Sequence, residues 1–166
     1  RMLSEKIDLV PKTLLVYRHN FYLLLFLSTL LALGAYPLIL LFYGRPFLSS
    51  VTPFFVLLPG AFFLYVNNIL TNYLVGTKRF WAVSFISVEE ALINVALNIF
   101  FIPRWGITGA AFSSSVTYVL VGAAYMMVFM RLSDLSPKAF FSNLRPAADD
   151  FALYRESWRS IFSRRG

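Results

Sequence analysis

The chain lacks cysteine altogether and has a single histidine, His19, among its 166 residues. Without cysteine it can form neither a disulfide nor a thiolate metal site, and it offers no cysteine nucleophile. One histidine cannot build a histidine-cluster metal site on its own. The sequence therefore predicts no bound metal and no other cofactor.

Charge is also scarce. Charged residues make up 14% of the chain and hydrophobic residues 58%, against about 25% and about 45–50% in soluble globular proteins. Eighteen phenylalanines are too many for a soluble core of this size. This composition is typical of an all-α, polytopic membrane protein. It excludes a soluble enzyme and, despite the net charge of +7, a nucleic-acid-binding protein.

Catalytic motifs are missing as well. The sequence contains no phosphate-binding loop, no serine nucleophile elbow and no zinc-protease motif. We therefore expect that the chain is not an enzyme.

Four apolar stretches are long enough to cross a bilayer, which takes about 20 helical residues. We expect spans at 21–43, 54–76, 80–102 and 107–130, joined by short connections that contain Gly and Pro. Residues 1–20 form a polar lead-in, and residues 131–166 form a tail outside the membrane. Because the chain begins with Arg1 and has no visible signal peptide, we expect it to be a piece of a longer protein.

The basic residues predict the orientation. Thirteen of the fifteen Lys and Arg residues lie in the lead-in, in the connection between the second and third spans, or in the tail. These three segments share one side of the membrane, and only Arg45 and Arg104 lie on the other. Since basic residues concentrate in the cytoplasm, both termini should be cytoplasmic in a plasma (inner) membrane. Lys78 and Arg79, in the connection, are either topology anchors or part of a cytoplasmic mouth.

The tail has two predicted helices. Ser136 and Pro137 indicate a helix start. Between residues 151 and 162 apolar side chains recur at helical spacing with arginines between them. This pattern favours an amphipathic helix on the anionic cytoplasmic leaflet, and the alternative is a disordered basic tail.

Two carboxyl groups, Glu89 and Glu90, lie deep in the third span. They are about ten residues from its start, which at 1.5 Å per residue is about 15 Å and close to the bilayer midplane. A lone charge there costs at least about 2.5–3.5 kcal/mol, so it must face water or a partner, or be protonated. Helical spacing places Glu90, Asn94 and Asn98 on one stripe, whereas Glu89 points about 100° away.

We expect Glu90 and its stripe to line a transport pathway, and Glu89 to lie at a helix contact or, alternatively, in the pathway. Alternatively, the whole stripe only forms hydrogen bonds that hold neighbouring helices together. Asn68 and Asn72 form a second polar strip, which either lines a cavity or docks on the third span. In the fourth span, the pair Gly109 and Ser113 predicts close approach of a neighbouring helix.

One junction resembles a known family. Residues 97–111 read LNIFFIPRWGITGAA, and this is similar to a signature of the polysaccharide biosynthesis flippases in the multidrug/oligosaccharidyl-lipid/polysaccharide exporter superfamily. LFYG at 41–44 followed by Phe47, and Pro59-Gly60 followed by GTKR at 76–79, resemble further parts of these proteins. The resemblance extends over roughly residues 10–135.

The resemblance implies the closing four helices of the second of two bundles that surround a central cavity. It further implies ion-coupled alternating access, with H+ or Na+ as coupling ion, a lipid-linked oligosaccharide or polysaccharide precursor as substrate, and a missing N-terminal bundle as partner. Flippases of pyrophosphate-linked lipids need cationic cavities, whereas the deep charges here are acidic. The acidic pair fits ion coupling or a cationic substrate, so a multidrug exporter of the same superfamily is one alternative. A non-transporting structural membrane subunit is the other.

Overall fold

The computed structural model describes residues 2–145, with side chains from Leu9 onward. The regular elements of this part are all helices: α1 (Met2–Tyr43), η1 (Arg45–Ser50), α2 (Val51–Gly76), α3 (Phe80–Leu132) and α4 (Pro137–Ser142). The all-α prediction is thus confirmed for these residues. The predicted amphipathic helix of the tail lies outside them.

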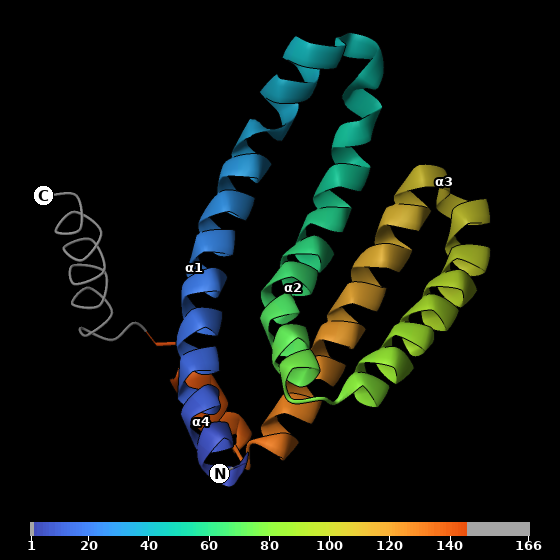
Figure 1. Cartoon of the computed structure of the whole chain (residues 1–166). Helices are drawn as coiled ribbons and strands as arrows, with labels where there is room; N and C mark the ends of the chain where they lie inside the picture. The colour runs from blue at the N-terminus through green and yellow to red at the C-terminus, as the bar shows by residue number, and fades with distance from the viewer. Residues whose placement is uncertain (1, 146–166) are drawn as a thin grey trace, which may run out of the picture.

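Three helical segments are long and apolar enough to cross a membrane. They are Leu9–Tyr43, Arg45–Gly76 and Phe80–Leu132. The last belongs to α3, which is interrupted at Gly106, where φ is 56° and ψ is −133°. At this point α3 reverses direction, so that its two parts run side by side (Figure 1). Residues 80–105 are called the first half of α3 below, and residues 107–132 the second half.

Element boundaries differ from the prediction in three places. Helix α1 begins at Met2, so the lead-in continues directly into the first apolar stretch. Helix α2 begins at Val51, so the first connection ends before Pro53. The third connection was predicted to span Pro103 to Gly106, but only Gly106 leaves the helical conformation. Proline keeps its helical φ and can be accommodated inside a membrane helix, which is why the boundaries at Pro53 and Pro103 were misplaced.

Glycines permit the reversal within α3. The backbone angles at Gly106 belong to a region that side chains with a Cβ avoid. Three residues later, a Cβ on Gly109 would collide with the backbone carbonyl of Phe101. The two halves therefore touch backbone to backbone immediately after the turn, which confirms the close approach predicted at Gly109.

The connection between α2 and α3 is a Schellman turn. Lys78 has a φ of 60°, its N–H donates to the Val75 carbonyl at 3.0 Å, and the Arg79 N–H donates to the Leu74 carbonyl at 2.8 Å. This turn lies at the same end of the molecule as the start of α1 and α4, whereas η1 and the reversal of α3 lie toward the opposite end (Figure 1). The antiparallel arrangement thus places the turn between α2 and α3 at the end of the molecule where α1 starts.

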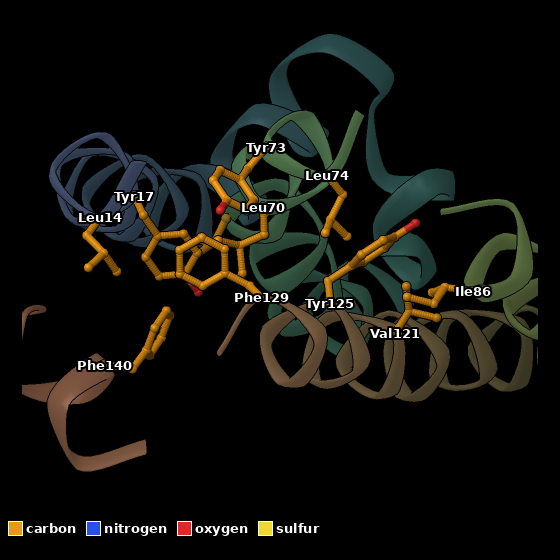
Figure 2. Packing of buried hydrophobic residues seen from close by; sticks show 11 residues of the cluster. Leu14, Tyr17, Leu70, Tyr73, Leu74, Ile86, Val121, Tyr125, Phe129 and Phe140 are labelled. Carbon is orange, nitrogen blue, oxygen red and sulfur yellow. The ribbon is translucent and has the colours of Figure 1, made fainter. Parts of the chain in front are cut away.

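The core gathers near the end that holds α4 (Figure 2). Edge-to-face aromatic contacts connect four elements: Tyr17 of α1 to Phe140 of α4 with centroids 5.3 Å apart, and Phe129 of α3 to Phe140 at 6.1 Å and to Tyr73 of α2 at 4.9 Å. Such pairs stabilise beyond the area they bury. The other buried members of the cluster are Leu14, Val66, Leu70, Leu74, Ile86, Val121 and Tyr125.

Helix α4 begins where the sequence predicts. The Ser136 Oγ caps it by accepting a hydrogen bond from the Ala139 N–H at 3.2 Å, and Pro137 follows. Helix α1 holds its other end: the Arg18 guanidinium donates to the carbonyls of Asn143 and Arg145, both at 3.3 Å. The beginning of the tail is therefore fixed to α1, a contact that no local sequence pattern predicts.

Candidate functional site

A small pocket brings the two predicted polar strips together. Its volume is about 160 Å³. Glu90 contributes from the first half of α3, and Asn68 contributes from α2. The remaining lining residues are Leu64, Asn67, Thr71, Val121, Gly122 and Tyr125, from α2 and the second half of α3. The pocket therefore lies where α2 meets both halves of α3.

Asn67 forms the buried wall of this pocket. Its side chain is 2% exposed, its Nδ2 donates to the Phe63 carbonyl at 2.8 Å, and its Oδ1 accepts from the Tyr17 hydroxyl at 3.4 Å. It also fills the space left by Gly122, where an added Cβ would come within 2.6 Å of Nδ2. Asn67 adjoins Asn68 in the sequence, and nothing local reveals its partner on α1.

The stripe that carries Glu90 divides into two parts. Glu90 is half-buried at the pocket, whereas Asn94 donates to the second half of α3, to Ser114 Oγ at 3.5 Å and Thr117 Oγ1 at 3.4 Å. Asn98 in turn donates to Asn94 Oδ1 at 2.8 Å. Glu90 alone of the three thus lines the pocket. The contacts of Asn94 favour the interhelical alternative for that residue, whereas the Asn98 bond stays within the first half of α3.

The second strip divides in the same way. The Asn72 Nδ2 donates to the Asn68 Oδ1 at 3.0 Å, and both side chains are exposed. Asn68 lines the pocket and Asn72 does not. The amide hydrogen bond nevertheless fixes the orientation of Asn68 beside Glu90.

The remaining predicted residues lie outside the pocket. Lys78 and Arg79 are exposed in the turn between α2 and α3. Glu89 is exposed on the first half of α3, so the helix contact predicted for it is not made within residues 9–145.

The chemistry of the pocket follows from its polar atoms. Its lining residues include one carboxylate, two amides and the hydroxyl-bearing Thr71 and Tyr125, and no basic residue lines it. Such a set can hold a proton, a hydrated monovalent cation or a hydroxyl-bearing ligand. In the described part of the chain, no cluster of three His, Asp or Glu residues could ligate a metal.

Comparison of the chain with protein-family models, curated proteins and solved structures finds no match. The structure therefore defines only the general class of protein: a helical protein whose described part has three helices that are long and apolar enough to cross a membrane. The family resemblance of residues 97–111 stays a prediction.

The Asn94 contacts lead to a first testable prediction. Polar bonds between membrane helices are worth about 0.6 kcal/mol on average and up to about 1.7 kcal/mol, so Asn94→Ala should lower the free energy of unfolding by about that amount. A double-mutant cycle with Thr117→Val, followed by circular dichroism during denaturation in micelles, measures the coupling. Val95→Ala, at an exposed neighbour, is the control. Strict additivity of Asn94→Ala and Thr117→Val would contradict the interhelical bond.

Proposed function

We propose that this chain is the C-terminal part of a flippase. The protein would move lipid-linked oligosaccharide or polysaccharide precursors across the plasma membrane by ion-coupled alternating access. The observation that carries the proposal is Glu90, a carboxyl group in a polar pocket between otherwise apolar helices. Ionisable groups inside membrane helices typically mark substrate or ion pathways.

The junction motif supports the same family. Two positions in residues 97–111 require glycine. Gly106 adopts the backbone angles of the turn, and Gly109 allows the backbone contact between the two halves of α3. The sequence that resembles the flippase signature is therefore the sequence that builds the reversal of α3. This agreement between motif and geometry supports the resemblance. The proposed mechanism, by contrast, rests on Glu90.

In this proposal, the chain crosses the membrane four times. Each half of α3 has 26 residues and a length of about 39 Å at 1.5 Å per residue, enough for a hydrocarbon core of about 30 Å. The end that holds Lys78, Arg79 and α4 is cytoplasmic, in accord with the distribution of basic residues. The tail from residue 131 onward then lies on the cytoplasmic side.

The coupling step would occur at Glu90. An ionised carboxylate needs water or a cation in the pocket, whereas a neutral one tolerates closure of α2 against α3. Binding of H+ or Na+ therefore changes the relative free energy of an open and a closed pocket, and biases inward-facing against outward-facing states. Asn68 and Thr71 would orient the ion or its water.

The decisive experiment replaces Glu90 by Gln in the intact transporter and measures glycan export across a series of pH values. We expect export to fall about tenfold or more, which corresponds to the loss of an interaction of about 1.4 kcal/mol. Glu90→Asp should retain part of the activity because the ionisable group remains. Ser87→Ala, at an exposed polar site on the same helix, is the matched control. Unchanged export of Glu90→Gln at every pH would remove Glu90 from the mechanism.

A second function is favoured by one observation. The pocket is acidic and no basic side chain lines it, which suits a cationic drug better than a pyrophosphate-linked lipid. Export of cationic dyes by the intact protein, without any effect on glycan export, would identify a multidrug exporter. Transport of neither class would favour a structural subunit.

A further inference from the structure

Helix α4 is a separate small unit that is fastened to α1. Three consecutive backbone carbonyls directly after it, those of residues 143–145, accept hydrogen bonds from α1. The Arg18 guanidinium donates to the first and the third at 3.3 Å, and the Tyr22 hydroxyl donates to the second at 2.8 Å. With six residues, α4 is far shorter than the roughly 12–15 residues that an isolated helix needs. These contacts therefore hold it in place, and α4 can dock or detach as a whole.

Tyr17 of α1 contacts both α4 and the wall of the Glu90 pocket. Its ring meets the Phe140 ring edge to face with centroids 5.3 Å apart, and Figure 2 shows the two side chains next to each other. Its hydroxyl donates to the Asn67 Oδ1 at 3.4 Å. Tyr17 and Asn67 are both 2% exposed, so a shift of either disturbs its closely packed neighbours. One side chain thus connects α4 to a residue that lines the pocket.

Asn67 has little freedom to compensate for a displaced Tyr17. Its Nδ2 donates to the Phe63 carbonyl at 2.8 Å, and a Cβ on Gly122 would come within 2.6 Å of the same atom. Because the amide group is planar, a fixed Nδ2 also fixes the direction of Oδ1, toward α1. A buried oxygen that loses its donor is costly unless water replaces the donor. Loss of the Tyr17 hydroxyl therefore admits water at the pocket wall.

We propose that α4 controls the access of water to the Glu90 pocket. While α4 is docked, Phe140 holds Tyr17 against Asn67, and the pocket is closed on the side of α1. Release of α4 frees Tyr17, which leaves Asn67, and water then reaches the pocket. Tyr17 is a positioning residue in this device, because it acts on the pocket through Asn67. Any partner that binds released α4 more tightly than docked α4 opens the pocket.

The other walls of the pocket keep their places when α4 is released. Helix α2 is bonded to α3 independently of α1, since the Gly60 N–H donates to the Ser115 Oγ at 3.0 Å, and Asn94 joins the two halves of α3. Helix α1 retains a second bond to α2, from the Asn20 Nδ2 to the Tyr65 carbonyl at 3.3 Å. The effect of release is therefore confined to the contact between Tyr17 and the pocket wall.

The test measures water access at Thr71, which lines the pocket. Thr71→Cys is introduced into the intact protein in membrane vesicles; this chain has no cysteine of its own, and any cysteine elsewhere is replaced. The probe is aminoethyl methanethiosulfonate, a small cation that reacts with hydrated thiols. Tyr17→Phe keeps the ring but removes the hydroxyl, and it should speed modification about threefold, which corresponds to about 0.6 kcal/mol, the average for a polar bond between membrane helices. Tyr65→Phe, at an exposed tyrosine of α2, is the control and should change nothing.

Variants of α4 test the control itself. Phe140→Ala should speed modification as Tyr17→Phe does, whereas Phe141→Ala, at an exposed site of α4, should not. In a protein that already carries Tyr17→Phe, Phe140→Ala should have no further effect, because the link to Asn67 is already broken. If Phe140→Ala fails to fold, Tyr22→Phe takes its place, because it removes only one hydrogen bond to the segment after α4.

Three results would overturn the proposal. They are an unchanged rate in Tyr17→Phe, equal rates in Phe140→Ala and Phe141→Ala, and additive effects of Phe140→Ala and Tyr17→Phe. The rate of thiol modification does not depend on what the protein transports. Failure here is therefore distinct from failure of the proposed function, which the export measurement with Glu90→Gln decides separately.

Discussion

Replacement of Gly109 by alanine is expected to lower the free energy of unfolding by about 1–3 kcal/mol, the usual cost of overpacking. The added methyl group would meet the Phe101 carbonyl and the Ile102 amide. Both are backbone groups of a helix and cannot rotate away as a side chain does. The two halves of α3 would have to separate next to Gly106, although a single residue connects them there.

Denaturation in micelles, followed by circular dichroism, measures this effect. Gly76→Ala is the matched control, because no atom lies within 4 Å of a Cβ at that position. Alanine in an unhindered helical site usually stabilises by a few tenths of a kcal/mol up to about 1 kcal/mol. Equal destabilisation by Gly109→Ala and Gly76→Ala would mean that the halves of α3 are not in backbone contact.

Replacement of Phe140 by alanine is expected to detach α4 from the rest of the molecule. Phe140 is 0% exposed and contacts the rings of Tyr17 and Phe129. Truncation of a buried phenylalanine costs about 3–5 kcal/mol. Because α4 has only six residues, local opening requires less free energy than unfolding of the long helices, and α4 will separate first.

Limited proteolysis near residues 138–145 detects this opening, and spin labels on α1 and α4 measure the distance between them. The adjacent Phe141 is 54% exposed, so Phe141→Ala changes the same residue type without removing the buried contact. We expect at least tenfold faster cleavage of Phe140→Ala than of Phe141→Ala, since tenfold corresponds to only about 1.4 kcal/mol. Comparable cleavage rates would contradict the anchoring role of Phe140.

The sequence predicts the helices well because apolar runs of membrane length are unambiguous. It places the helix ends at 43 and 76 and the start at 80 as the structure has them, since Gly44 and the polar run after Gly76 interrupt the apolar pattern. Pro53 and Pro103 misled the prediction. Both are compatible with helical φ, and at Pro103 the turn depends on Gly106 instead.

The candidate site is only partly predictable. Spacing alone places Glu90 and Asn94 on one stripe, but contacts between helices decide that Glu90 meets α2 while Asn94 meets Ser114 and Thr117. The bond from Tyr17 to Asn67 joins residues 50 positions apart. Similarly, Tyr22 donates to the Leu144 carbonyl at 2.8 Å across 122 positions. No local periodicity contains this information.

The single-residue turn at Gly106 restricts how the chain can change shape. With no spare residues there, and with Asn94 bonded to Ser114 and Thr117 further along, the halves of α3 cannot slide past one another. Glu90 and Tyr125, one on each half, therefore keep their spacing as parts of a stiff hairpin. Helix α2 is bonded to the same hairpin, since the Gly60 N–H donates to the Ser115 Oγ at 3.0 Å, so the wall that carries Asn68 and Thr71 is held against it.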